Sequence, residues 1–376
     1  MNRPLQIRSL RALVWRYPLK TPVVTSFGTM SDRPMVLVRV EDVDGVAGWG
    51  EVWCNFPAVG AEHRARLVHG VLAPLLTSRA YRDPADAFDA LTDATAVLAL
   101  QAGEPGPFAQ AIAGVDIALW DLHARRAQQP LWRLLGGTSP RVRVYASGLN
   151  PERPADLASM RRTEGFRAFK LKVGFGRERD LENVSALRET LGDSVDLMVD
   201  ANQAWSLETA IDMARLLEPY TIGWIEEPLR ADRPWSEWRT LHEQTGIPLA
   251  AGENLAGGAA FDAALEAGVL AVIQPDIAKW GGFTRVIDIA RRITAAGARY
   301  CPHWLGGGIG LLASAHALAA TGGSGVLEVD ANPNPLRSAT CGPLAQASDG
   351  CAVLNNRPGL GIEPDLARLQ AYAVAL

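Results

Sequence analysis

Apolar and polar positions follow two different patterns along this chain. Residues 35–52 alternate between apolar and polar side chains and are interrupted by Asp44-Gly45, which predicts an antiparallel β-hairpin. Residues 61–76 and 107–127 carry apolar side chains at steps of three and four, which is typical of amphipathic helices. The first part of the chain therefore predicts an α+β domain with its own sheet.

After the break "GGTSP" at 136–140, short apolar segments alternate with helical ones such as 179–192 and 284–297. We interpret eight of these segments as strands: 142–148, 166–174, 195–202, 222–229, 247–253, 269–278, 297–304 and 325–330. Strands joined by helical crossovers predict a parallel barrel wrapped by helices.

The predicted fold class is therefore α/β, a modified TIM barrel of the (β/α)7β form with an α+β N-terminal capping domain. We expect the capping domain in residues 1–130 and the barrel in residues 131–340. Residues 341–376 are expected to return to the capping domain.

Ionisable side chains gather at the predicted strand ends. Lys170 and Lys172 lie two residues apart in one strand, so both point to the same face, where they repel and lose hydration. The later strands end in acids, amides or histidine: Asp200, Asn202, Glu226, Glu227, Glu253, Asp276, His303 and Glu328. Any one of these side chains could belong to a structural salt bridge. Independent salt bridges at so many successive strand ends are a poor explanation, because each group must be desolvated. In such barrels the strand ends form the active site.

Three of these acids predict a metal site. Asp200, Glu226 and Glu253 are 26 and 27 residues apart, about one strand–helix unit each. Neighbouring strands lie about 4.8 Å apart, so the carboxylates can converge. Convergent carboxylates do not all stay ionised without a cation, and oxygen ligands without Cys or His favour Mg²⁺. The negative charge of these carboxylates would also offset the repulsion between Lys170 and Lys172.

Asp276 and His303 are 27 residues apart on neighbouring strands. A lone histidine at an apolar strand end is usually a core residue, but a carboxylate beside it fixes its tautomer and stabilises its protonated form. Lys172 would face His303 across the metal, with its pKa lowered by like charge. A metal flanked by two bases suits removal of a proton next to a carboxylate, since cations stabilise the enediolate that forms.

Composition narrows the classes of protein. A length of 376 residues fits one large and one smaller domain. The net charge of −4 and the lack of a basic cluster argue against a nucleic-acid partner. Four cysteines without C-x-x-C spacing argue against a disulfide framework or zinc knuckle and suit a reducing cytoplasm. We see no signal peptide and no apolar run long enough for a membrane span, so we expect a cytoplasmic protein.

Several motifs together resemble a known family. They are "GWGE" (48–51), "KLK" (170–172), "VDAN" (199–202), "IEEP" (225–228), "AGEN" (251–254), "QPDIAKWGG" (274–282), "CPHW" (301–304) and "LEVDANPNPL" (327–336). In this order and spacing they resemble the enolase superfamily in its mandelate racemase branch, the mandelate racemase/muconate lactonizing enzyme family. The likeness extends over nearly the whole chain.

The resemblance implies roles for individual residues. Asp200, Glu226 and Glu253 would ligate Mg²⁺, and Lys172 and the His303–Asp276 dyad would be the acid/base groups. Lys170 would tune Lys172 and contact the substrate carboxylate, to which Glu328 would also hydrogen-bond. Asn202 would contact the substrate or the surroundings of the metal. Cap loops near 17–30 and 51–60 would close over the substrate, with Phe27, Trp53, Asn55 and Trp304 as binding candidates; packing between cap and barrel is the alternative role of the aromatics.

The leading functional prediction is a Mg²⁺-dependent lyase that dehydrates a hydroxy- or sugar-acid through an enediolate. A racemase, epimerase or lactone cycloisomerase would use the same groups and is the alternative. A barrel that binds a metal–carboxylate complex without turnover is the third possibility, but it would need neither base. The expected partner is a small-molecule carboxylate, and the resemblance also implies a homo-oligomer.

Overall fold

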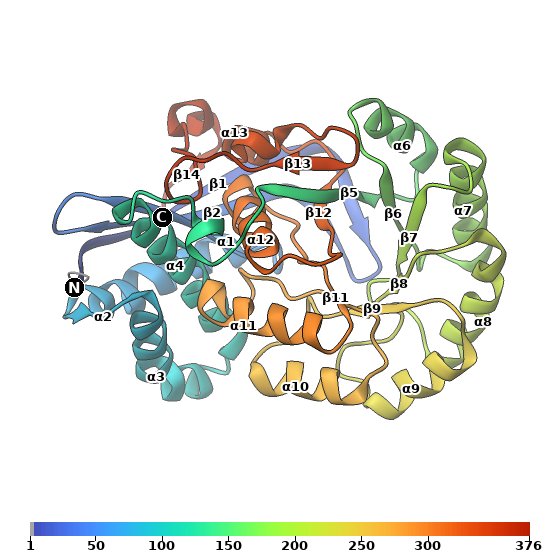
Figure 1. Ribbon diagram of the computed structural model, residues 1–376, viewed down its shortest axis with the longest axis horizontal. Coiled ribbons are helices and arrows are strands. Elements are labelled where there is room, and N and C mark those ends of the chain that lie inside the picture. Colours follow the sequence, from blue (N-terminus) through green and yellow to red (C-terminus); the bar gives the residue numbers. More distant parts are fainter. Residues whose placement is uncertain (1–3) are drawn as a thin grey trace.

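The N-terminal part is an antiparallel sheet backed by helices (Figure 1). This computed structural model describes residues 4–376. The sheet has the order β14-β1-β2-β3, with β4 paired to β1, and β14 (Ala373–Val374) comes from the end of the chain. Its elements are β1 (Leu5–Thr25), β2 (Gly28–Asp42), β3 (Ala47–Val52), β4 (Ala80–Tyr81), α1 (Gly60–Leu67), the π-helix η1 (Val68–Leu72), α2 (Ala73–Thr77), α3 (Pro84–Ala102) and α4 (Pro105–Arg126).

The hairpin predicted at Asp44-Gly45 is confirmed, because β2 and β3 pair across it and Gly45 has a φ of 84°. The long strand β1 and helix α3 were not predicted. β1 contains Arg, Lys and Pro among its apolar residues, which hides the period of two. It pairs with β2 from Ile7 to Thr25, with register shifts after Ile7 and Pro18. At the tip of this hairpin the Ser26 hydroxyl donates to the Asn202 carbonyl of the barrel.

The second part is the predicted parallel barrel. Its strands run in the order β11-β10-β9-β8-β7-β6-β5-β12. Their bounds are β5 (Arg141–Leu149), β6 (Ala168–Lys172), β7 (Asp196–Asp200), β8 (Ile225–Glu226), β9 (Leu249–Ala251), β10 (Val272–Ile273), β11 (Arg299–Tyr300) and β12 (Leu327–Asp330). Every predicted strand overlaps an observed one, and the fold class is confirmed.

One layer of side chains shows that the sheet closes on itself. The cluster takes one residue from each strand or its immediate flank: Tyr145, Ala168, Met198, Trp224, Ala250, Val272, Cys301 and Val326. β12 also pairs with β5 in parallel, so the last strand lies beside the first. The layer fills the barrel interior and leaves the C-terminal strand ends free to carry polar groups.

Helices cover the outside of the barrel (Figure 1). They are α6 (Pro154–Thr163), α7 (Arg177–Leu191), α8 (Leu207–Leu217), α9 (Trp235–Gln244), α10 (Gly258–Ala267), α11 (Gly282–Ala295) and α12 (Gly308–Thr321), preceded by the short α5 (Leu131–Leu134). The predicted helices at 179–192 and 284–297 correspond to α7 and α11. Helix α11 buries Val286, Ile289, Ala290 and Ile293, the one-sided pattern of an amphipathic helix.

The last segment contacts both parts. After α13 (Pro335–Thr340), strand β13 (Cys351–Val353) pairs with β5 of the barrel. Strand β14 (Ala373–Val374) then pairs with β1 of the cap. The chain thus ties the cap to the barrel at its end.

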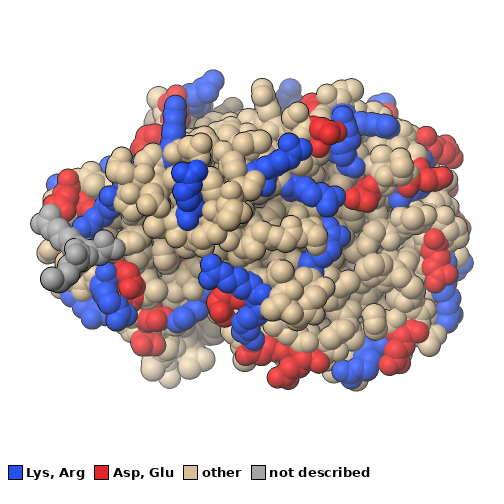
Figure 2. All heavy atoms as spheres, in the orientation of Figure 1, with Lys and Arg blue, Asp and Glu red and all other residues tan. Residues whose placement is uncertain are grey.

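The surface carries both signs of charge. Figure 2 shows Lys and Arg interspersed with Asp and Glu over the visible face. Within residues 4–376, no helix is both long and apolar enough to cross a membrane.

A buried glutamate joins the cap sheet to the barrel. Glu51 on β3 is 1% exposed and accepts hydrogen bonds from the backbone N–H groups of Gly307 (2.6 Å) and Gly310 (2.8 Å), at the start of α12. A Cβ built on Gly307 would lie 2.4 Å from Glu51 Oε1, so glycine is needed for this approach. The carboxyl oxygens supply acceptors to helix N–H groups that lack intrahelical partners.

We expect Glu51→Ala to lower the free energy of unfolding by about 3 kcal/mol, because it leaves buried N–H donors without an acceptor. Glu62→Ala is the control. Glu62 pairs with Arg16 at 2.7 Å but is partly exposed, so its loss should cost less than about 1 kcal/mol. Urea unfolding followed by circular dichroism measures both, and equal losses would contradict the role of Glu51.

Glu51 also predicts a pH dependence. Burial raises its pKa to about 8, against the lowering effect of the Gly310 and Gly307 N–H groups. The folded state holds the Glu51 carboxyl proton more tightly than the unfolded chain does. The contribution of this proton to the free energy of unfolding is therefore complete below about pH 4.5. It is lost as the pH rises to about 8. Glu51→Gln should therefore gain stability relative to wild type between pH 5.5 and 8.5, by an amount on the order of a few kcal/mol. A difference that stays constant with pH would refute this titration.

Candidate active site

The strand ends of the barrel face a cavity of about 170 Å³ beneath the cap. From the cap it is lined by residues that include Val23, Phe27, Met30, Arg33, Trp53 and Asn55. From the barrel side it is lined by residues that include Lys172, Asn202, Glu253, Lys279, His303 and Asn332. The cavity therefore lies between the tip of the β1–β2 hairpin and the C-terminal ends of the barrel strands.

The two lysines of β6 have different surroundings. Lys172 lines the cavity, and its Nζ lies 2.5 Å from Asp200 Oδ2. Lys170 is fully buried below it, and its Nζ contacts Glu226 Oε1 (2.5 Å), Glu328 Oε1 (2.8 Å) and the Tyr145 hydroxyl (3.4 Å). Lys170 thus neutralises the acids below the cavity. It does not line the cavity, so its predicted contact with the substrate stays a prediction.

The expected lowering of the Lys172 pKa is wrong for this structure. Burial has the largest single effect and lowers this pKa, as does Lys170, but the Asp200, Glu226 and Glu253 carboxylates together raise it more, so the net shift is upward. The pKa of Lys170 is raised further because burial is outweighed by Glu226 and Glu328. Each ammonium is held by a carboxylate, and this attraction exceeds the repulsion between the two lysines.

His303 forms the predicted dyad geometry with Asp276. Its Nδ1 lies 2.7 Å from Asp276 Oδ2, and its Nε2 lies 2.5 Å from Glu253 Oε2. Asp276 in turn accepts the backbone N–H groups of Ala278 and Lys279, which fixes its orientation. Burial lowers the pKa of His303, but Glu253, Glu328 and Asp276 raise it well above its usual range. The structure thus places a charged imidazole at the cavity, with Nδ1 held by Asp276.

The three predicted metal ligands come from neighbouring strands. Asp200 pairs with Glu226 in the β7–β8 ladder, and Glu253 follows the end of β9. Within residues 4–376, no three acidic, histidine or cysteine side chains are close enough together to hold a metal ion. Each carboxylate contacts a cationic side chain instead. Asp200 contacts Lys172, Glu226 contacts Lys170, and Glu253 contacts His303. Their assignment as ligands stays a prediction.

The charge at the mouth fits a divalent cation. Six acids (Asp200, Glu226, Glu227, Glu253, Asp276 and Glu328) face four cationic groups (Lys170, Lys172, Lys279 and protonated His303), and none of these side chains is more than 12% exposed. Two carboxylates are therefore in excess when all ionise. Burial and this repulsion raise the pKa of Glu226 to about 7 and that of Glu227 well above its usual range. Hard oxygen donors are the ligands that Mg²⁺ prefers, and a divalent cation would offset this excess of negative charge.

The backbone is strained next to these acids. Asn202, Gln203 and Glu227 have φ values of 42°, 67° and 40°, although none is glycine. Such conformations cost about 1–3 kcal/mol each and concentrate at functional sites. Asn202 lines the cavity, and its backbone N–H donates to Asp200 Oδ1 at 2.8 Å. Glu227 accepts hydrogen bonds from Asn254 Nδ2, which also donates to Glu253.

Glu328 lies at the centre of the buried network. It accepts hydrogen bonds from the Ser147 hydroxyl (2.5 Å) and the backbone N–H of Trp304 (3.0 Å), in addition to its ion pair with Lys170. Lys170 and two nearby cations, His303 and Lys172, outweigh burial and hold the pKa of Glu328 at about 2. It is 1% exposed, so its predicted contact with substrate would require a ligand that reaches below Lys172.

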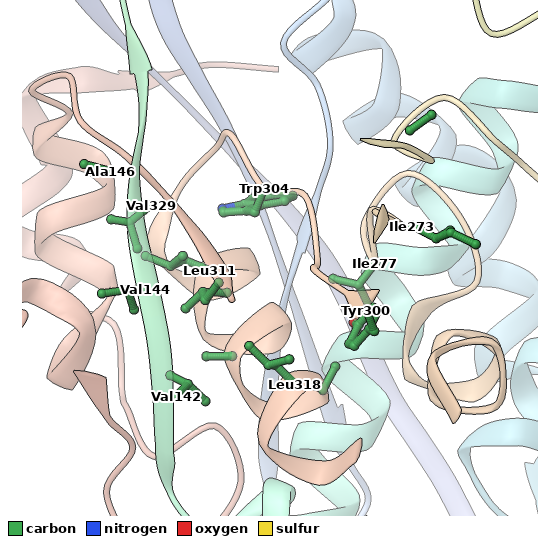
Figure 3. Packing of buried hydrophobic residues seen from close by; sticks show 14 of the residues in the cluster. Val142, Val144, Ala146, Ile273, Ile277, Tyr300, Trp304, Leu311, Leu318 and Val329 are labelled. Atoms are coloured by element: carbon green, nitrogen blue, oxygen red, sulfur yellow. The ribbon is translucent and has the colours of Figure 1, made fainter. Parts of the chain in front are cut away.

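Three of the four remaining binding candidates line the cavity. Phe27 packs edge to face on Phe56, Lys279 lies 4.7 Å from the centre of the Trp53 ring, and Asn55 donates to the Leu305 carbonyl. Trp304 does not line it. This side chain is 1% exposed, donates to the Gly307 carbonyl and packs among core residues such as Leu311 and Val329 (Figure 3). Trp304 thus packs between barrel and cap, which is the alternative role stated above for the aromatic candidates.

The sequence patterns did not identify several cavity residues outside the predicted cap loops, among them Arg33, Asn150, Leu305 and Asn332. Arg33 lies in the alternating strand β2, where an arginine is expected to face solvent. Asn332 belongs to a quoted motif, but only the fold shows that it faces the cavity with Asn150, to which it is hydrogen-bonded at 2.9 Å.

Comparison with known families gives the relationship directly. Residues 9–136 match the family described as mandelate racemase/muconate lactonizing enzyme, N-terminal domain, and residues 153–368 match the enolase C-terminal domain-like family. The chain belongs to the mandelate racemase/muconate lactonizing enzyme family of the enolase superfamily, as the motifs predicted.

Related enzymes act on sugar acids. The chain is 37% identical to 3,6-anhydro-alpha-L-galactonate cycloisomerase of Streptomyces coelicolor, over 98% of this chain and 99% of that one. It is 33% identical to D-galactarolactone cycloisomerase of Agrobacterium fabrum, with 96% of each covered. Arabinonate dehydratase of Saccharolobus solfataricus is 30% identical over 88% of this chain and 89% of its own.

Solved structures agree with the fold. A mandelate racemase/muconate lactonizing enzyme from Bordetella bronchiseptica superposes with a TM-score of 0.94 at 58% identity, covering 98% of this chain and all of that one. A racemase from Streptomyces coelicolor with bound magnesium has a TM-score of 0.86 at 33% identity, with the same coverage.

Mg²⁺ should stabilise the folded protein by relieving the excess negative charge. At a concentration 100 times the Kd, binding contributes about 2.7 kcal/mol, a rise in Tm of about 3 °C or more. Thermal unfolding with and without Mg²⁺ measures this shift. Glu226→Gln should reduce it, whereas the exposed Glu208→Gln should not. An unchanged shift in Glu226→Gln would remove Glu226 from the ligand set.

Proposed function

We propose that this protein is a Mg²⁺-dependent enzyme that removes the proton α to the carboxylate of a sugar acid and expels the oxygen on the β-carbon. The observation that carries the proposal is that Lys172 and His303 both line one cavity beside Asp200 and Glu253. A protein that only bound a metal–carboxylate complex would need the acids but neither base.

Asp200, Glu226 and Glu253 would hold Mg²⁺, and the excess of two carboxylates at the mouth supports this assignment. When bound, the ion supplies the positive charge that stabilises an enediolate. Lys170 adds a fixed positive charge on the same side, because Glu226 and Glu328 keep it protonated and immobile.

His303 is suited to deliver a proton to the leaving oxygen. Asp276 holds Nδ1 at 2.7 Å, so proton transfer occurs at Nε2, the nitrogen beside Glu253. Lys172 is suited to take the α-proton at Nζ, for which it must leave its ion pair with Asp200 and be neutral. The two groups come from β6 and the segment after β11, so they reach the cavity from different sides.

Dehydration of an acyclic sugar acid is the reaction that these groups support best. Lactone or ether ring opening by the same elimination is the second candidate. It is favoured by the cycloisomerases, which are related at 37% and 33% identity over nearly the whole chain. In the first case the leaving oxygen departs as water, and in the second it remains in the product.

His303→Asn should reduce elimination at least about 100-fold, because general acid catalysis contributes about that factor or more. Exchange of the α-hydrogen through Lys172 should persist. Proton NMR in D₂O with Mg²⁺ follows both events on galactonate, galactaro-1,4-lactone and 3,6-anhydrogalactonate. The control is His242→Asn on the exposed surface. Elimination at the wild-type rate by His303→Asn would refute the role of His303. Exchange with inversion but no elimination in the wild-type protein would indicate a racemase.

A further inference from the structure

A second ionic cluster lies above Glu328 at the end of β12. Glu328 and Asp330 are two residues apart on this strand and so share a face, with Asp330 nearer the mouth. Asp330 Oδ2 lies 2.9 Å from Arg33 Nη2 and 3.0 Å from Arg337 Nη1. Asp330 Oδ1 accepts the backbone and side-chain N–H groups of Asn332, both at 2.9 Å. The cluster joins β2 of the cap to β12 and α13.

This cluster carries one uncompensated positive charge. Two guanidinium groups share one carboxylate, and Arg33, Asp330 and Arg337 are only 2%, 4% and 8% exposed. A buried charge without a counter-ion is costly, so one further anion would stabilise the cluster. Nothing in its own contacts supplies that anion.

The two arginines differ in what they leave unused. Arg337 Nη2 donates to the Asn332 carbonyl at 2.9 Å. Arg33 has only its ion pair and a 3.7 Å contact from Nη1 to the Met30 sulfur, and its buried Nε has no hydrogen-bond partner among the described residues. Arg33 also lines the cavity, whereas Arg337 does not. Arg337 Nη1 and Arg33 Nη2 likewise have no hydrogen bond besides their ion pairs with Asp330. Arg33 Nε has neither, and it belongs to the arginine that lines the cavity.

The barrel topology places Arg33 across the mouth from the acids. β12 is four strands from β8 in the ring of eight, so the two strands lie on opposite sides. Asp200, Glu226 and Glu253 are centred on β8, and Arg33 is held at β12. Lys172 on β6 and His303 after β11 lie between these two sides, where a reacting carbon would be.

We propose that Arg33 binds a second carboxylate at the far end of the substrate, and that the substrate class is a sugar diacid or its monolactone. The proposal rests on the proposed function for the position of the reacting carboxylate. A carboxylate neutralises the buried charge, which a hydroxyl cannot do, and it matches the planar donors of a guanidinium. Arg33 is then a specificity-determining residue supplied by the cap.

Galactarate and galactonate provide a matched test, because they differ only in a carboxylate or a hydroxymethyl group at one end. The ligand-dependent rise in Tm of the Mg²⁺-loaded protein gives the Kd of each acid. NMR of the same samples shows whether either is consumed. We expect wild type to bind galactarate at least about 10-fold more tightly, the gain of one charge-assisted interaction.

Arg33→Met should abolish this preference, and Arg33→Lys should restore part of it. Arg337→Met is the matched control, since it removes the same positive charge from the cluster without lining the cavity. It should weaken the preference without abolishing it, because the Arg33 donors that face the ligand remain. The proposal is overturned if wild type shows no preference for galactarate, or if Arg33→Met and Arg337→Met change it equally. A preference without consumption of either acid would instead contradict the proposed reaction alone.

Discussion

The packing of ionised groups at the barrel mouth is the constraint on which the rest of this structure depends. Six acids and four cationic groups lie where almost no water reaches them. Burying an ion costs several kcal/mol unless partners surround it, so each group must be held at a fixed place by its strand. A closed barrel meets this requirement, because its interior layer sets the strand positions and its ends bring groups from distant parts of the sequence together.

The cap completes the site from the other side. Glu51 fixes β3 to the start of α12, just after the loop that carries His303 and Trp304. Arg33 on the neighbouring strand β2 contacts Asp330 on β12. The cap is thus attached to the barrel by ionised groups as well as by apolar packing, and the same strands that hold it also line the cavity. The barrel strand ends would then carry the groups that react with the substrate, and the cap would select the far end of the substrate through Arg33.

Much of this site could be predicted because strand ends leave a regular signal. Asp200, Glu226 and Glu253 recur at the spacing of one strand–helix unit, and Asp276 and His303 do the same. Local pattern could not place Arg33, because its partner Asp330 is distant in the sequence. It did not reveal β1, because Arg, Lys and Pro interrupt the period of two in that strand. The local pattern also gave the wrong direction for the pKa shift of Lys172, because the pKa of a buried amine depends on which carboxylates the fold places beside it. Trp304 follows the predicted His303, yet its side chain points into the core, a direction that the sequence does not specify.

The most direct measurement is a crystal structure of the protein grown with Mg²⁺, with the ion identified by its octahedral oxygen ligands. Mg²⁺ bound by Asp200, Glu226 and Glu253, with Lys172 released from Asp200 toward the cavity, is the predicted result. A structure in which these three acids remain paired with Lys172, Lys170 and His303 at saturating Mg²⁺ would contradict the central claim that the excess charge at the mouth is there to hold a metal.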